Sequence, residues 1–285
     1  MGRLRSIYIN EIEVKEISIF KALLIVVIFT VIPVIANLIS TVILLLIDED
    51  MSLGSIMIVG TIVVIVFMIL TIMIVARIFT NKNNIINNNI EFKIIKKDFI
   101  CVFFIIIGYI LIRDALLFET LSAFEGPITE EDINFLIENS TDIEAGIVMI
   151  LLQLQALIQA PIFEELLFRG IILNGLLNRY KGNQKKAILY SAIIFGVVHF
   201  NIPQGINAFM IGIILGGIYY YTGSMKLAIF AHFINNLFVF IPVPSNIIIK
   251  IAYVALGIFL IIKSIKNISI NTKKYFENRK RNIGL

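Results

Sequence analysis

Two adjacent carboxylates and an arginine interrupt a long apolar stretch of this chain. Glu164, Glu165 and Arg169 lie within the mostly apolar run 145–177, which exceeds the about 20 residues that a helix needs to cross a bilayer. A charge in hydrocarbon costs at least about 2.5–3.5 kcal/mol, so ionisable residues at such depth are expected to be paired, hydrated or functional. This stretch is therefore the first candidate for a chemical role.

Helical spacing separates the two carboxylates. Glu165 and Arg169 are four residues apart and share a helix face, whereas Glu164 points in another direction. We expect Arg169 to hold Glu165 in an ion pair and Glu164 to project into a cavity. The structural alternative is an ion-pair network that only joins helices, although buried ion pairs contribute little net stability.

The only two histidines of the chain also lie in apolar stretches. Asn236 follows His232 by one helical turn and shares its face, while His199 ends a separate stretch. A single histidine on an apolar helix is more often a hydrogen-bonded core residue than a catalyst. Together, however, a carboxylate, two imidazoles and an amide supply a base for water, a second proton carrier and donors for an oxyanion. These groups are the parts of a hydrolytic site, and His and Glu side chains are also zinc ligands.

The order of these motifs resembles a known family. Glu-Glu-x-x-x-Arg from Glu164, Phe-x-x-x-His from Phe195 and His-x-x-x-Asn from His232 look like the three motifs of the CAAX prenyl protease and bacteriocin-processing (CPBP) family of intramembrane proteases. That family includes the Ras-converting CAAX protease of eukaryotes. The resemblance covers about residues 153–238, and the segment 212–236 is similar beyond the motif residues. Each motif alone is weak, whereas the ordered set on separate spans is specific.

The resemblance implies a role for each of these side chains. Glu164 with His199 would activate the attacking water, and His232 with Asn236 would stabilise the oxyanion. The supporting residues would be Glu165, Arg169 and Phe195. We expect a glutamate-based hydrolysis without an obligatory metal, although the family was historically classed with the metalloproteases. The alternative is a divalent zinc bound by Glu164, His199 and His232.

The composition indicates a membrane protein with many spans. Of the 285 residues, 59% are hydrophobic and 15% are charged, and the mean hydropathy is +0.95, whereas soluble domains carry about 25% charged residues. The apolar runs show no alternating pattern, so they are expected to be helices rather than barrel strands. We predict an all-α bundle of about eight transmembrane helices, with candidate spans at 17–47, 52–79, 98–117, 145–177, 187–200, 205–221, 227–242 and 246–263.

The charged residues predict how the bundle is oriented. Lys and Arg gather at one set of helix ends, whereas the loop 48–50 and the long loop 118–142 are acidic and contain neither. The positive-inside rule then places both termini in the cytoplasm and requires an even number of spans. Basic residues at helix ends reflect membrane topology, so no nucleic-acid partner is expected. For the long loop, a solvated segment is favoured over a short interfacial helix.

Three regions are predicted along the chain. Residues 1–142 would form the first three transmembrane helices with the acidic extracytoplasmic loop, residues 143–264 the CPBP-like core, and residues 265–285 a basic cytoplasmic tail. The only cysteine, Cys101, excludes an intrachain disulfide. Pro161 lies inside the fourth span and is expected to kink or break the helix just before Glu164.

The depths of the candidate residues do not match at first sight. Counted from the basic helix ends, Glu164 and His199 lie about 20 Å deep, but His232 lies only about 9 Å from the level of Lys226. For the site to assemble, either the turn 222–224 penetrates the bundle or the fifth span starts below the interface. Gly212 and Gly216 form a G-x-x-x-G pair that permits close helix approach, although ordinary packing unrelated to the site is favoured for them.

Three functions remain open at this point. The first is an intramembrane endopeptidase that cleaves a membrane-associated protein or peptide. The second is a catalytically silent bacteriocin-immunity or scaffold protein, since the resemblance includes such members. The third is a proton-coupled transporter, against which the lack of an internal repeat counts. The Ile- and Asn-rich composition favours a multi-pass protein of a bacterial plasma membrane.

Overall fold

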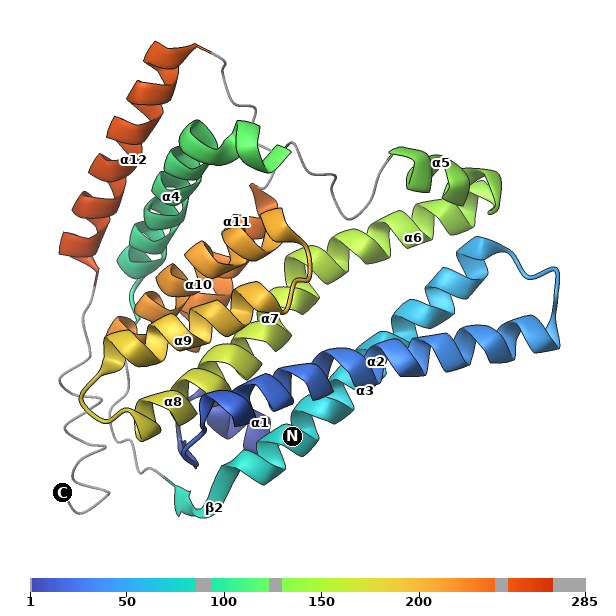
Figure 1. The fold of residues 1–285 in the computed structure, drawn as a ribbon, viewed down its shortest axis with the longest axis horizontal. Helices are drawn as coiled ribbons and strands as arrows, with labels where there is room; N and C mark the ends of the chain where they lie inside the picture. The colour runs from blue at the N-terminus through green and yellow to red at the C-terminus, as the bar shows by residue number, and fades with distance from the viewer. Residues whose placement is uncertain (1, 86–93, 123–129, 239–245, 269–285) are drawn as a thin grey trace.

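Helices make up most of the computed structural model, which describes residues 2–85, 94–122, 130–238 and 246–268 (Figure 1). The α-helices are α1 Gly2–Tyr8, α2 Ile19–Ile47, α3 Leu53–Phe79, α4 Lys96–Ser122, α5 Glu130–Glu138, α6 Asp142–Leu154, α7 Ala160–Glu165, α8 Asn174–Arg179, α9 Gln184–Val197, α10 Ile202–Thr222, α11 Met225–Leu237 and α12 Ile247–Asn267. Two π-helical segments are η1 Gln155–Gln159 and η2 Leu166–Leu173. The predicted helical membrane fold is thus observed.

A small antiparallel sheet was not predicted. Strand β1, Ile12–Val14, pairs with β2, Thr80–Ile85, at the end of α3. Strand β1 alternates apolar and polar residues over only three positions, and β2 is mostly polar, so neither is long and apolar enough to predict a strand.

The described helices include six that are long and apolar enough to cross a membrane: Ile19–Ile47, Leu53–Phe79, Lys96–Leu117, Asp142–Arg179, Ile202–Thr222 and Ile247–Asn267. The other two predicted spans correspond to α9, with 14 residues, and α11, with 13 residues. Both are shorter than the about 20 residues that cross a bilayer, because a turn follows each of them. The predicted count of eight membrane-crossing helices is therefore not confirmed, although all eight helical segments exist.

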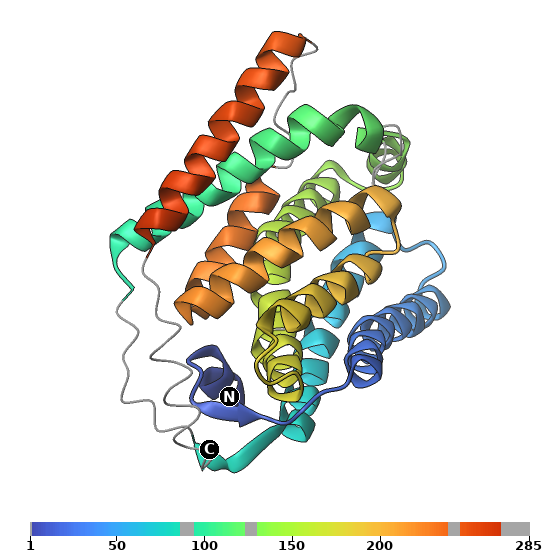
Figure 2. The same cartoon turned by 60° about the vertical axis from the view of Figure 1, so that its left-hand side comes forward.

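The elements that carry the site occupy the middle of the bundle. Helices α2 and α3 pair on one flank, α4 and α12 pair on the other, and α7 to α11 lie between them (Figure 2). Helix α12 approaches α4 so closely that a Cβ atom on Gly108 would lie 2.7 Å from the carbonyl oxygen of Gly257. Only glycine fits at this crossing. The pair α2–α3 exposes many large apolar side chains, as expected for a surface that faces lipid.

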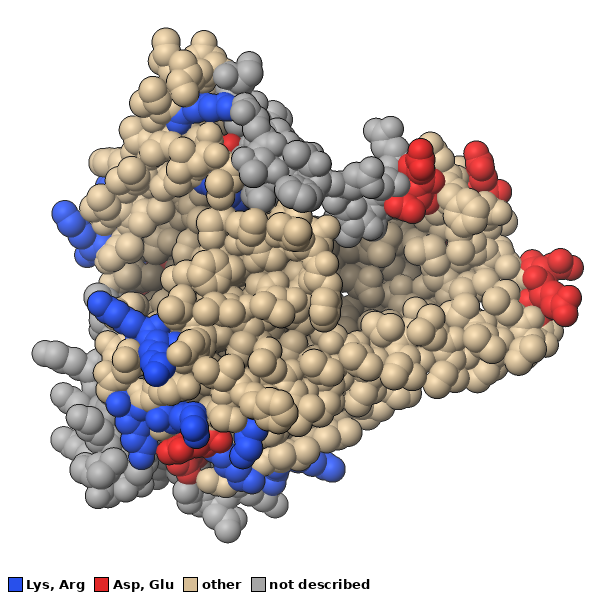
Figure 3. Space-filling model, viewed as in Figure 1, with Lys and Arg blue, Asp and Glu red and all other residues tan. Residues whose placement is uncertain are grey.

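Most of the basic side chains gather at one end of the molecule, where a few acidic ones lie among them, and the far end carries acidic side chains (Figure 3). Exposed lysines gather near the α8–α9 turn, and acidic side chains lie at the α2–α3 loop and on α5 (Figure 3). This separation follows the pattern from which the cytoplasmic termini were predicted. Residues 130–138 form helix α5 instead of the favoured solvated loop, and Leu136 of α5 packs with Ala145 and Val148 of α6. An apolar side chain every turn gives this acidic helix a face to bury.

The turn between α10 and α11 is buried. Thr222, Ser224 and Met225 are each no more than 3% exposed. The N-terminal segment covers the turn, because Asn10 Nδ2 donates to the carbonyl oxygen of Gly223 over 2.8 Å. The burial of this turn comes from the covering N-terminal segment, so both alternatives for the depth of His232 stay predictions.

Candidate active site

One continuous helical rod, from α6 through η1, α7 and η2 to α8, carries Glu164 and Glu165. Pro161 stands in the first turn of α7, directly after η1, and cannot donate a backbone hydrogen bond there. The expected break appears as a change of hydrogen bonding, since the amide of Ala160 donates to Gln155 in a π-helical turn and the helix continues. Short π-helical turns occur frequently at functional sites, and the two carboxylates lie between two of them.

Glu165 and Arg169 form the predicted ion pair. Arg169 Nε lies 3.1 Å from Glu165 Oε2, and both side chains are almost fully buried. Arg169 Nη2 also donates to the carbonyl oxygen of Gly212 over 3.3 Å, so this glycine is connected to the site. The guanidinium lies 4.8 Å from the centroid of the Phe195 ring, a distance typical of a cation–π contact. Arg169 therefore joins α9 and α10 to the helix that bears the carboxylates.

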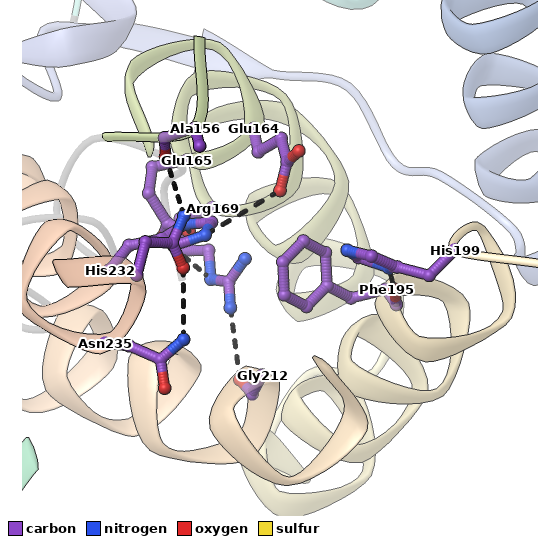
Figure 4. Close-up of polar contacts among 10 residues, drawn as sticks. Ala156, Glu164, Glu165, Arg169, Phe195, His199, Gly212, His232 and Asn235 are labelled. Atoms are coloured by element: carbon purple, nitrogen blue, oxygen red, sulfur yellow. Dashed lines mark hydrogen bonds and ion pairs between the residues drawn. The ribbon is translucent and has the colours of Figure 1, made fainter. Parts of the chain in front are cut away.

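His232 contacts both glutamates (Figure 4). Its Nδ1 lies 2.9 Å from Glu165 Oε1, and because an ionised carboxylate only accepts, Nδ1 must carry the proton of this bond. Nε2 lies 3.9 Å from Glu164 Oε2. Glu165 thus holds Arg169 with one oxygen and His232 with the other. The sequence predicted the contact of Glu165 with Arg169, which lies on the same helix. It did not predict the contact with His232, because sequence spacing does not show which residues of different helices meet.

His199 lies on the other side of the Phe195 ring from His232 (Figure 4). The two imidazoles meet this ring edge-on, with centroid distances of 5.1 Å for His199 and 5.8 Å for His232. His199 Nδ1 is 2.8 Å from the carbonyl oxygen of Phe195. Since a carbonyl cannot donate, Nδ1 bears the proton and Nε2 of the neutral ring is unprotonated.

The candidate residues were expected to meet in one site, and His199 is the one that does not contact the glutamates directly. Within the described ranges, no hydrogen bond or ion pair joins His199 to Glu164 or His232. Glu164, Glu165, Arg169 and His232 come together directly, and His199 reaches them through Phe195. Phe195, predicted as a supporting residue, touches both imidazoles and the guanidinium.

Asn236 reaches the same helix rod as the glutamates. Its Nδ2 donates to the carbonyl oxygen of Ala156, in η1, over 2.8 Å. Asn235, which the sequence analysis did not single out, donates from Nδ2 to Asn236 Oδ1 over 3.1 Å. The sequence shows two consecutive asparagines, but side chains at adjacent helix positions ordinarily point apart. The sequence therefore gave no sign of a hydrogen bond between Asn235 and Asn236.

Several buried polar atoms around His232 have no hydrogen-bond partner among the described residues: Glu164 Oε2, Glu165 Oε2, Arg169 Nε, Arg169 Nη1 and Asn235 Oδ1. Arg169 Nε and Glu165 Oε2 lie within ion-pair distance without the alignment of a hydrogen bond. Buried polar groups usually have partners. Such a cluster therefore indicates a place that binds water or a polar group of a ligand.

The candidate zinc ligands do not fit a three-ligand site as they are arranged. Glu164 and His232 face each other, but the third candidate, His199, is held behind the Phe195 ring by the backbone of its own helix. Across the ranges that the structure covers, no three His, Cys, Asp or Glu side chains gather as metal ligands do. A catalytic zinc takes three protein ligands, which this arrangement does not supply.

Fold and site together define a multi-pass helical membrane protein with a buried glutamate–histidine centre. Residues 146–238 match the family model described as Rce1-like, type II CAAX prenyl endopeptidase Rce1-like. The matched segment ends at the same residue as the resemblance noted in the sequence and contains all of the candidate residues. This match confirms the resemblance: residues 146–238 are similar to the CAAX protease family. Neither the curated proteins nor the solved structures gave a match.

Proposed function

We propose that this protein is an intramembrane endopeptidase that hydrolyses a peptide bond of a membrane-associated protein or peptide with water activated by Glu164. The observation that carries the proposal is the facing pair of Glu164 Oε2 and His232 Nε2, 3.9 Å apart, in which Glu165 orients the imidazole. The family of the matched segment supports a peptidase. The Glu164 side chain is 22% exposed, whereas that of Glu165 is fully buried, so Glu164 is the better candidate for contact with water.

In the proposed reaction, Glu164 accepts a proton from water as the water oxygen attacks the peptide carbonyl carbon. The carbonyl π electrons move to the oxygen, and an N–H of Asn236 stabilises this oxyanion. When the oxyanion collapses, the C–N bond breaks and Glu164 returns the proton to the leaving nitrogen. A carboxylic acid and an amine result, and the enzyme is regenerated.

His232 and His199 have different parts in this proposal. His232, held by Glu165, would exchange a proton with Glu164 or donate to the oxyanion when Nε2 is protonated. His199 has its Nε2 lone pair available but is separated from the glutamates by Phe195. We infer that His199 assists Glu164 only when Phe195 moves away, as a bound substrate could require.

The first prediction is that Glu164→Gln abolishes processing. Removing a general base lowers a rate by about 10²- to 10⁴-fold, while the isosteric amide leaves the packing intact. Membranes from cells that express the wild type or the variant are compared by mass spectrometry for peptides that arise by cleavage. The wild type should yield termini that are absent with Glu164→Gln.

Glu131→Gln, on the exposed surface of α5, is the matched control and should behave as the wild type. Identical peptide patterns with and without Glu164 would overturn the peptidase proposal. A biological phenotype that survives Glu164→Gln would then favour the scaffold alternative, and substrate flux driven by a proton gradient in liposomes would favour the transporter.

A further inference from the structure

We propose that Asn235 is a positioning residue that fixes the side-chain amide of Asn236 for binding the oxyanion. This inference rests on the proposed function, because it assigns a purpose to a residue next to the site. The family resemblance gives Asn236 its role, but nothing in that resemblance assigns one to Asn235.

The contacts of Asn235 connect it to Asn236. Asn235 is 3% exposed and lies on the buried side of α11. Its Nδ2 donates to Asn236 Oδ1 over 3.1 Å, and Figure 4 draws this bond next to His232. Consecutive helix positions do not ordinarily face each other, so both side chains must adopt particular rotamers to meet. The bond is thus a specific feature of this helix.

The bond also decides which way the Asn236 amide points. In the observed orientation, Asn236 accepts from Asn235 and donates to the carbonyl oxygen of Ala156 over 2.8 Å. Turning this amide by half a turn would place its oxygen against the Ala156 oxygen and its nitrogen against Asn235 Nδ2. Acceptor would then face acceptor and donor would face donor. The two neighbours together therefore permit a single orientation.

A fixed amide leaves one hydrogen-bond donor for the substrate. The NH₂ group of asparagine has two donors, and Asn236 uses one of them for Ala156. With its oxygen held by Asn235, the amide directs the second N–H away from both neighbours. Donation to the amide oxygen also polarises the group and strengthens its N–H as a donor. Without Asn235 only the carbonyl of Ala156 holds the amide, which is then less firmly oriented, and the oxyanion loses part of its stabilisation.

The enzymatic test compares Asn235→Leu, Asn235→Gln and Asn236→Ala. The probe is a synthetic peptide that spans a cleavage site found in the membrane comparison, presented to full-length protein in detergent micelles. Removing one oxyanion donor lowers kcat by about 10²- to 10³-fold, which we expect for Asn236→Ala. Asn235→Leu should lower kcat by about tenfold or more with KM almost unchanged, because the interaction is used in the transition state. Asn235→Gln, which keeps an amide donor, should recover part of the rate.

Asn178→Leu is the matched control for loss of a buried asparagine. Asn178 Nδ2 donates to the carbonyl oxygen of Val14, away from the carboxylates, so this variant should lose stability and keep the kcat of the folded protein. Wild-type kcat in Asn235→Leu, or a change in KM alone, would overturn the proposal.

A second measurement does not depend on activity. Protein labelled with ¹⁵N-asparagine is examined by NMR in micelles, where the Asn236 side-chain signals are identified by their loss in Asn236→Asp. We expect two well-separated proton shifts in the wild type and in Asn178→Leu, and collapsed or shifted signals in Asn235→Leu. Unchanged Asn236 signals in Asn235→Leu would show that Asn235 does not orient the amide. If no peptide is cleaved at all, the proposed function fails, and this spectrum still decides whether Asn235 fixes Asn236.

Discussion

Glu165 contacts two partners at the centre of the site, and each of them presents an N–H group to a different carboxylate oxygen. One oxygen lies 3.1 Å from the Arg169 guanidinium, and the other accepts from the His232 imidazole over 2.9 Å. No part of the Glu165 side chain is exposed to solvent. A charge in that position is stable only while its partner is charged as well. Glu165 therefore supports two neighbours, which agrees with the proposal that Glu164 is the base for water.

At the residue scale, we predict that Glu165→Gln strongly destabilises the protein. The amide has the same shape but no charge, so it leaves the buried Arg169 guanidinium without its partner. Breaking a buried ion pair costs about 3–5 kcal/mol, which thermal unfolding in micelles will register as a lower Tm. Glu164→Gln is the control, because Glu164 is partly exposed and should change the Tm little. Equal melting of both variants would refute the structural role of Glu165.

At the scale of elements, the N-terminal segment supports the helix rod that carries the glutamates. Ile7 of α1 lies against Gly170 of η2, and Tyr219 of α10 donates to Asn10 and accepts from Asn174 over 2.7 Å. Residues from α1, η2, α8 and α10 are thus connected beneath the site. The connection helps to keep the turn 222–224 buried, directly before the helix that carries His232.

We predict that Gly170→Ala displaces α1 from η2. A Cβ atom at Gly170 would lie 2.5 Å from Ile7 Cγ2, and overpacking of this kind costs about 1–3 kcal/mol. Gly146→Ala is the matched control on the same rod, since a Cβ there meets nothing within 4 Å, and alanine there should stabilise the helix by up to about 1 kcal/mol. Unfolding of both variants in micelles, with limited proteolysis of the N-terminal segment, measures the difference. Equal stability of the two variants would contradict the close packing of α1.

At the scale of the whole molecule, the separation of charge predicts the orientation in the membrane. Lysines near the α8–α9 turn and acidic residues on α5 lie at opposite ends (Figure 3). By the positive-inside rule, the lysine end faces the cytoplasm. The buried glutamate–histidine centre lies on short helices between those two ends, where its charges must be enclosed by protein.

Labelling of single cysteines tests this orientation. Cys101 is the only cysteine and is 6% exposed, so the wild type should react little with a membrane-impermeant maleimide. In intact cells we expect labelling of Glu131→Cys on α5. Lys181→Cys, in the α8–α9 turn, should react only after the membrane is permeabilised. The reverse pattern would show that the termini lie outside.

Much of the site could be predicted, because some of its contacts join residues close in the chain and because its three motifs follow one another in a specific order. Glu165 and Arg169 pair because four residues on one helix bring two side chains together whatever surrounds them. The three motifs predicted the resemblance, and the family model matches the segment that contains all of them. Apolar runs of sufficient length located the helices, although the number that cross the membrane depends on where the turns lie in space.

Contacts between helices were decided by the tertiary structure alone. The bond of His232 to Glu165, the Phe195 ring between the two imidazoles and the Asn235–Asn236–Ala156 connection all depend on how far each helix is shifted and rotated against its neighbours. The short strands β1 and β2 pair across more than sixty residues of chain. The sequence by itself determined which side chains share a helix face, because that periodicity is a property of the backbone. Which faces meet was determined by packing, since the fit of side chains sets the shift and rotation of each helix.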